Sequence, residues 1–447
     1  MAELLIQWRD ELARRMDAGR TRIATLRSYA DGHAPAPVAA NEKTRDAWRS
    51  FQRRSRTNFG ELIIEALAER LIPNGVKATD DDARTRAMRV WRRNRLSVAF
   101  ADTFRDALTV GRGYMFVTTS TPGEALITSE APEFVEVDVD PHRPWLPRAV
   151  LRVWRDRGAR TDYAAVWVDG EHVTWSRAWS SDERAEVPAS VLGGTWIEVP
   201  ESREDYVGAP PVFVFENHDG TGEFEPHLDV LNRINAGILD RLVTSATQAF
   251  RQLAVSGVPM RDAAGNLIDY AKIFAPGPDA LWVMPTSETG LDPKIWESKV
   301  TDMGPMLEAV KADVLQLAAV TRTPSATLLP SADNQSAEGA AFAREGLVFK
   351  ARDRIDRFTA PGEEMLERAL RAEGVDADLE LQFAPPEHVS LNERTNAANQ
   401  AIAAGVPWRE VMAAVMGFSP TKIDELEVLR AQEQLATAAF LGDGNAA

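Results

Sequence analysis

Two helical segments that flank a compact insertion constrain the fold of this 447-residue chain more than any other feature. The first spans residues 226–257 and carries apolar residues at intervals of three or four: Leu231, Ile234, Ile238, Leu242, Ala246, Phe250 and Leu253. A helix of this length measures about 45 Å. The second spans 301–322 and carries another stripe, Leu307, Val310, Val314 and Leu317. Because one chain cannot bury both stripes around a protruding insertion, we expect neighbouring copies to cover them.

The insertion itself, residues 258–300, is rich in proline and glycine. It contains one apolar run typical of a β-strand, ALWVMP, at 280–285. Gly257 and Pro259 are expected to end the helix that precedes it.

The part of the chain before residue 225 divides into helices and then strands. Helical spacing holds to about residue 110, including one continuous helix over VWRRNRLSVAFADTFRDALTVG (90–111). Seven short β runs follow between Tyr114 and Asn217, which predicts a sheet. The Asp169–Gly170 pair between two of these runs predicts a two-residue type I′ hairpin turn, because both positions need positive φ.

The part after residue 322 reads as a turn-rich loop and further helices. The loop, TPSATLLPSADNQS, covers 323–336, and a long helix is predicted from Ser336 as its N-cap. Pro361 and Gly362 are expected to kink that helix, since proline removes a backbone donor. A capping box at Ser390 and Glu393 begins a helical tail.

Composition limits the classes of protein that the chain can belong to. The 51 basic and 67 acidic residues leave a net charge of −16, which disfavours a protein that grips nucleic acid for its affinity. With no cysteine, disulfides, thiolate metal sites and cysteine nucleophiles are excluded. The amino terminus reads as an amphipathic helix rather than a signal peptide, and no apolar run is long enough for a membrane span.

Catalytic motifs are scarce. The sequence has no phosphate-binding G-x-x-x-x-G-K-[ST] and no G-x-S-x-G nucleophile elbow. Asp138, Asp140 and His142 could place oxygen and nitrogen ligands around a divalent ion. An acidic pair at the solvent-facing end of a strand explains the same pattern, and we favour that interpretation.

The order of the parts resembles the portal proteins of tailed double-stranded DNA bacteriophages of the long-tailed type. The residues that carry this resemblance are spread along the chain. They include LRSYADG, NFGELIIEALAERLIPNGV, DALTVGRGYMFV, VDVDPHRPWLPRAVLRVW, LDVLNRINAGILDRL, LAAVTRTPSATLLPSADNQSAEGAAFAREGLVFKAR and AIAAGVPWREVMAAVMGFSP. No single run is diagnostic, but their collinear order is specific.

The resemblance implies an α+β portal fold, assembled as a ring, with a mixed α/β wing, a helical stem, a small α/β clip and a helical crown. The implied boundaries are a wing at 1–225, a first stem helix at 226–257, a clip at 258–300 and a second stem helix at 301–322. A tunnel loop at 323–336 follows. A long kinked wing helix with a strand at 337–386 and a crown at 387–447 complete the chain.

The resemblance also implies particular contacts. The tunnel loop would face DNA through Thr327, Leu328, Leu329, Ser331, Asn334 and Gln335. Lys311 on the second stem helix would line the channel. The clip would meet the packaging motor and later the tail adaptor through Asn266, Asp269, Tyr270 and Lys272.

The implied assembly is a homododecameric ring at one capsid vertex of the virion, formed in the host cytoplasm. Its implied partners are double-stranded DNA, the terminase large subunit, the major capsid and scaffolding proteins and a head–tail adaptor. The resemblance implies no cofactor, metal, enzymatic activity or membrane contact. Two rival hypotheses are a metal-dependent polynucleotide-processing enzyme that uses Asp138, Asp140 and His142, and a capsid adaptor that forms no ring itself.

Overall fold

The computed structural model describes most of the chain in two compact units. The described residues are 2–37, 45–78, 80–121, 123–179, 190–248, 253–256, 261, 265, 267–268, 294–297, 301–330, 337–387 and 391–443. The larger unit comprises residues 1–35, 57–232 and 314–447, and the smaller comprises 36–56 and 233–313.

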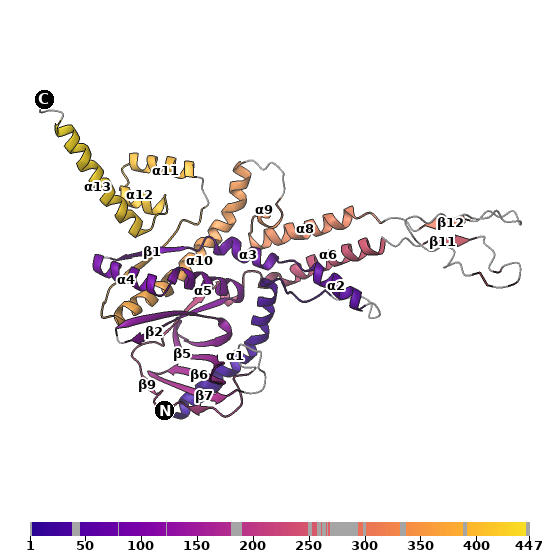
Figure 1. Cartoon of the computed structure of the whole chain (residues 1–447), viewed down its shortest axis with the longest axis horizontal. Coiled ribbons are helices and arrows are strands. Elements are labelled where there is room, and N and C mark those ends of the chain that lie inside the picture. The colour runs from indigo at the N-terminus through magenta and orange to yellow at the C-terminus, as the bar shows by residue number, and fades with distance from the viewer. Residues whose placement is uncertain are drawn as a thin grey trace. The chain divides into compact units, whose positions relative to one another are not determined.

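An antiparallel six-stranded sheet lies in the larger unit, near the end marked N in Figure 1. Its strands are β4 (Val135–Asp140), β5 (Arg143–Asp156), β6 (Thr161–Val168), β7 (Glu171–Ala178), β8 (Ile197–Glu198) and β9 (Glu204–Asp205), the last two both pairing with β7. Asp169 and Gly170 connect β6 to β7 with φ of 48° and 83°. The predicted hairpin turn is therefore confirmed.

Strict alternation along the strands gives this sheet two apolar faces. On one face Leu151 and Val166 pack with Leu12 and Met16 of α1 (Ala2–Ala30). On the other face Val150 and Trp167 pack against a second, three-stranded sheet. Trp167 and Trp175 thus belong to the core, whereas Trp145 on β5 is 71% exposed.

The three-stranded sheet has the order β10 (Val212–Glu216), β2 (Arg112–Thr121) and β3 (Glu124–Glu130). Phe215 of β10 meets Phe104 of α5 (Leu96–Val110) and Phe358 of α10 (Ala337–Ala372). The ring centroids of Phe104 and Phe358 are 4.8 Å apart. The layers of this unit therefore run from α1 through two sheets to α5 and α10.

The continuous helix predicted over residues 90–111 is wrong. The chain forms α4 (Asp81–Arg93) and α5, separated at Asn94 and Arg95. Arg95 has a left-handed φ of 51°, a conformation that a helix interior does not tolerate. Asn94 stabilises the break, since its side chain donates to Val90 O and accepts from Ile127 N.

The long helix α10 runs as one helix through Pro361, so the proline does not end it, and the predicted kink there stays a prediction. Its partner in this region is the two-stranded sheet of β1 (Pro73–Ala78) and β13 (Leu379–Phe383), which lies beside α3 (Phe59–Ala68) and α4 in Figure 1. A Cβ at Gly362 would lie 2.6 Å from Leu381 Cδ2. Helix α10 and β13 therefore approach each other closely at Gly362.

The segment predicted as the first stem helix is also shorter than expected. Helix α6 covers Leu228–Gln248, and Leu253–Ser256 form strand β11, which pairs with β12 (Lys294–Glu297). Periodicity did not separate these cases because a short apolar run fits both a helix end and a strand. The predicted strand at 280–285 lies outside the described residues.

The second stem helix corresponds to α8 (Gly304–Thr321). Within the smaller unit α6 and α8 lie side by side, as Figure 1 shows. Arg233 Nε is 2.9 Å from Asp313 Oδ1, and a Cβ at Gly237 would lie 3.0 Å from Val310 Cγ2. The two helices thus contact each other at these residues, while Leu307 of the second stripe stays 46% exposed. Helix α2 (Arg45–Ser55) belongs to the same unit.

Among the described residues, four more α-helices follow α8. They are the short α9 (Ser325–Leu328) after α8, and α11 (Leu391–Ala403), α12 (Trp408–Ala414) and the longer α13 (Pro420–Asp443) in the tail. The predicted N-caps Ser336 and Ser390 lie outside the described residues. None of the described helices combines the length and the hydropathy that crossing a membrane needs.

Candidate functional site

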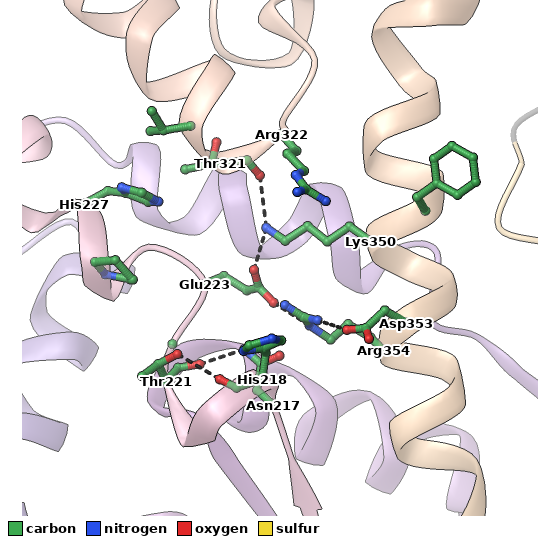
Figure 2. A pocket seen from close by; sticks show the side chains of 14 residues that line it. Asn217, His218, Thr221, Glu223, His227, Thr321, Arg322, Lys350, Asp353 and Arg354 are labelled. Carbon is green, nitrogen blue, oxygen red and sulfur yellow. Dashed lines mark hydrogen bonds and ion pairs between the residues drawn. The ribbon is translucent and has the colours of Figure 1, made fainter.

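A cavity of about 420 Å³ lies in the larger unit, where three segments distant in sequence converge (Figure 2). The first segment is 217–227, which follows β10. The second is the end of α8 with the residues after it, Val320–Arg322, and the third is Phe349–Arg354 of α10. Thr321, Arg322 and Thr323 are called the loop root below, because the predicted tunnel loop begins there.

The first segment is pinned against the end of α5. Glu223 N donates to Leu108 O at 2.8 Å, and Asn217 N donates to Gly111 O at 2.9 Å. A Cβ at Gly222 would lie 2.1 Å from Thr109 O, and one at Gly111 would lie 2.0 Å from Gly220 O. Glycine is therefore required on both sides of this contact, which fixes where the Glu223 side chain enters the cavity wall.

Glu223, Lys350 and Arg354 form a buried charged group, called the Glu223 cluster below. Glu223 is 7% exposed, and its two oxygens are 2.5 Å from Lys350 Nζ and 2.8 Å from Arg354 Nε. Burial by itself would raise the pKa of Glu223, but the charges of Lys350 and Arg354 outweigh it and hold that pKa below its ordinary value. The carboxylate is thus ionised, with both oxygens engaged.

Lys350 also reaches the loop root, as the dashed lines in Figure 2 show. Its Nζ donates to Thr321 O at 3.0 Å. Thr321 Oγ1 donates to Leu317 O at 2.8 Å and lies 2.9 Å from Thr323 Oγ1, and both threonines are buried. Between them Arg322 takes a left-handed φ of 54°. The chain therefore leaves α8 by one defined turn.

The rim of the cavity is polar and carries two histidines. Burial, and then the charge of Lys350, lower the pKa of His227, so its imidazole is neutral at pH 7. His218 Nδ1 lies 2.9 Å from Asp219 Oδ2. The buried amide of Asn217 donates to Thr221 O, and its Oδ1 has no hydrogen-bond partner among the described residues. These groups can bind water or a polar side chain, but they form no nucleophile–base pair.

The structure places some of the predicted site residues. Thr327 is exposed and Leu329 is half-buried. Leu328 is only 4% exposed because it packs inside the unit, so this structure does not offer its side chain to DNA. Lys311 is exposed on α8. Ser331, Asn334 and Gln335 of the loop, and Asn266, Asp269, Tyr270 and Lys272 of the insertion, lie outside the described residues.

The alternative metal site does not assemble. Asp138 is held by Arg15 at 2.6 Å and Arg148 at 2.7 Å. Asp140 accepts from the backbone N of His142 and from Arg143, both at 2.8 Å. Within the part of the chain that the structure describes, no three histidine, aspartate or glutamate side chains are grouped as metal ligands. Guanidinium groups already neutralise both carboxylates.

Sequence reasoning missed the Glu223 cluster. One signal was present: Lys350 and Arg354 stand at i and i+4 on a helix, where two like charges are destabilising unless an anion faces them. The anion could not be identified, because Glu223 is 131 residues from Arg354. The signal predicts a partner without naming it.

The chain belongs to the phage portal protein family described as SPP1 Gp6-like, whose sequence profile matches residues 9–438. It is therefore a portal protein, a structural protein of the portal vertex of a phage-like particle. The recognition made from the sequence is confirmed.

Solved structures similar to the chain come from gene transfer agent (GTA) particles. A chain in the virion of the native particle is 16% identical with a TM-score of 0.42, and the match covers 89% of this chain and 99% of that one. A chain in the neck of the empty particle, computed with C6 symmetry, is 15% identical with a TM-score of 0.46 and the same coverage. A chain in the neck of the native particle, computed with C12 symmetry, is 15% identical with a TM-score of 0.47, covering 88% and 98%. No curated protein sequence matches the chain significantly.

Proposed function

We propose that copies of this chain close into a dodecameric ring whose central channel passes double-stranded DNA into the procapsid and later out of the virion. The observation that carries the proposal is the family match over residues 9–438, within which α6, the β11–β12 insertion, α8 and the loop root follow one another in the predicted order. The ring assembles in the host cytoplasm and occupies one capsid vertex. It acts as a conduit, without a cofactor and without catalysis.

Exposed apolar side chains on α8 support ring closure. Leu307 and Leu315 are 46% and 43% exposed in the single chain. Apolar side chains repeated along one helix are stabilised when a partner covers them. A second copy of the chain, placed around a rotation axis, is the partner that this proposal assigns to them.

In this proposal each predicted segment of the chain contacts a different partner. The segment 258–300, with Asn266, Asp269, Tyr270 and Lys272, meets the terminase large subunit and later the head–tail adaptor. Capsid and scaffolding proteins surround the vertex.

The loop at 323–336 faces the DNA through polar groups. The loop's uncharged polar side chains can contact the phosphate backbone without binding it strongly enough to hold the DNA in place. These side chains are Thr327, Ser331, Asn334 and Gln335. The acidic chain repels phosphates, so that DNA finds no deep binding minimum and can slide. Lys311 supplies one of the few positive contacts.

Two-dimensional class averages and mass photometry of the purified chain test the ring. We expect particles with an open centre and a mass of about twelve protomers. A monomer that forms no pore at high concentration would overturn the proposal. Packaging by Lys311→Glu rings at the wild-type rate would remove Lys311 from the DNA contacts, without affecting the ring itself.

A further inference from the structure

We propose that Lys350, held by Glu223, is the positioning residue of the DNA-facing loop: it fixes the loop root, and thereby where the loop stands in the channel. This inference rests on the proposed function for the meaning of the loop's position. The contacts that carry it all lie within the larger unit.

Lys350 acts on the end of α8. The last carbonyl groups of a helix have no partner within the helix, and they attract a positive charge. Thr321 is the last residue of α8, and its carbonyl accepts from Lys350 Nζ at 3.0 Å. Beyond it the chain turns at Arg322 with positive φ, and Thr323 N donates to Ala318 O at 3.0 Å. Lys350 thus caps the helix at the residue from which the loop departs.

Glu223 determines where the Lys350 ammonium group stands. A lysine has a flexible four-carbon stem and would sample several positions without an anchor. Here Glu223 Oε2 holds Nζ at 2.5 Å, while Arg354 Nε holds Oε1 at 2.8 Å. With both carboxylate oxygens engaged, Glu223 cannot rotate. Glu223 N also donates a hydrogen bond to Leu108 O of α5. Through Glu223 and Lys350, α5 therefore helps to fix the position of the loop root.

The cavity explains why this contact controls position as well as stability. Thr321 and Arg322 border open space of about 420 Å³ on one side; Thr321 is otherwise buried, at 2% exposed, while Arg322 is exposed. On the cavity side, side-chain packing therefore contributes less to holding the loop root than it would in a closed core. Farther along, the buried Leu328 anchors α9, so the residues between Thr321 and Leu328 are the ones that loss of Lys350 would release.

Three variants and one matched control test the inference. Lys350→Met removes the donor, while Glu223 keeps Arg354 as its partner. Lys350→Arg keeps a donor long enough to reach both acceptors. Glu223→Gln removes the anchoring charge. Asp162→Asn is the control, because Asp162 is a fully buried carboxylate between Arg155 and Arg177 in the six-stranded sheet and contacts nothing in the loop root.

The first measurement is amide hydrogen exchange across residues 321–330 in assembled protein. For Lys350→Met and Glu223→Gln we expect exchange to rise about tenfold or more, as loss of a hydrogen bond to a charged group implies. Lys350→Arg should restore most of the protection, and Asp162→Asn should leave it unchanged. Unchanged exchange in Lys350→Met, or an equal rise in Asp162→Asn, would overturn the inference. If Glu223→Gln does not fold, the two Lys350 variants decide.

The second measurement is DNA packaging by the same rings, with the terminase motor supplied. We expect Lys350→Met rings of normal mass to package at least about tenfold less DNA, and Lys350→Arg to recover most of the loss. Full packaging by Lys350→Met rings with raised exchange would refute the positioning role. Failure of the wild-type chain to form rings would refute the proposed function instead, and hydrogen exchange across residues 321–330 of the unassembled chain would still decide whether Lys350 holds the loop root.

Discussion

The Glu223 cluster and a second group in the six-stranded sheet have almost the same composition and very different structural roles. The second group, called the Asp162 cluster below, consists of Asp162, Arg155 and Arg177. Each cluster places one buried carboxylate between two cations. Asp162 is fully buried, and its oxygens are 2.7 Å from Arg155 Nε and 3.4 Å from Arg177 Nε.

The two clusters differ in what they connect. Asp162 stands directly opposite Arg155 on β5 and Arg177 on β7, so strand register alone brings the three together. The two guanidinium groups lie over Trp179 and Trp196, at 4.7 and 4.4 Å from the ring centroids. Such a cluster stabilises one sheet locally. The Glu223 cluster instead joins a loop, a long helix and the end of a third segment, and it borders a cavity.

The comparison teaches that surroundings, more than composition, decide what a buried ion pair does. Enclosed between strands and aromatic rings, it has one geometry and contributes to stability. Beside open space and at a helix end, the same chemistry sets the position of the chain that follows.

The largest expected effect is the loss of either carboxylate. Glu223→Ala and Asp162→Ala should each lower the free energy of unfolding by about 3–5 kcal/mol, because two buried cations lose the carboxylate between them, even though Arg354 keeps Asp353 and Arg177 keeps two backbone carbonyls. Urea unfolding followed by tryptophan fluorescence measures this. If Glu223→Ala lowered the free energy of unfolding by less than about 1 kcal/mol, water in the cavity would be replacing the carboxylate. The conclusion that the two clusters have similar energetics would then be wrong.

Double-mutant cycles sharpen the comparison within the Asp162 cluster. We expect a coupling energy of about 1.5–3 kcal/mol between Asp162 and Arg155, since their contact is short and dry. The longer contact with Arg177 should couple by less than about 1 kcal/mol. Equal coupling would contradict the distances. Cycles between Glu223 and its two cations should instead give similar values, because both of those contacts are short.

Turn geometry tests whether register builds the Asp162 cluster. Gly170→Ala should destabilise the chain by about 1–2 kcal/mol, because φ of 83° is strained for any residue with a Cβ. The matched control is Gly19→Ala in α1, because a Cβ at this position meets no atom within 4 Å. This substitution should stabilise the folded chain by about 0.5–1 kcal/mol. Thermal unfolding should show a lower midpoint temperature for Gly170→Ala and a higher one for Gly19→Ala. If both variants changed stability equally, the Asp169–Gly170 turn would not be what sets the strand register.

A third carboxylate shows what burial does without such pairing. Burial raises the pKa of Glu136 on β4 to about 7; Arg112 and Arg15 oppose the rise and Asp138 adds to it. The folded state therefore binds a proton more tightly than the unfolded state, and stability falls as pH rises from about 4.5 through 7. Glu136→Gln should raise stability by about 1 kcal/mol at pH 8 and leave it unchanged at pH 4. Thermal melts at both pH values measure it, and a gain at pH 4 as well would contradict the pKa.

Sequence patterns predicted the strands, the Asp169–Gly170 turn and α8 well, because each depends on residues close together in the chain. The long helix after the loop was predicted with a kink at Pro361, and it runs through that residue as one helix; the close approach of Gly362 to Leu381 is a tertiary contact that the sequence pattern does not show. The break at Arg95 was missed because its stabilising partner, Ile127, belongs to another element. Residues 253–256 were assigned to a helix because their strand partner, 294–297, is far away in sequence.

By itself, the sequence determined the family, most of the order of helices and strands, and the Asp169–Gly170 turn between β6 and β7, because periodicity and turn chemistry act over a few residues. Only the tertiary structure decided that Glu223 faces Lys350 and Arg354, and that Lys350 caps the helix before the loop. The physical reason is that a buried charge must find a partner, but which partner it finds depends on how distant segments pack.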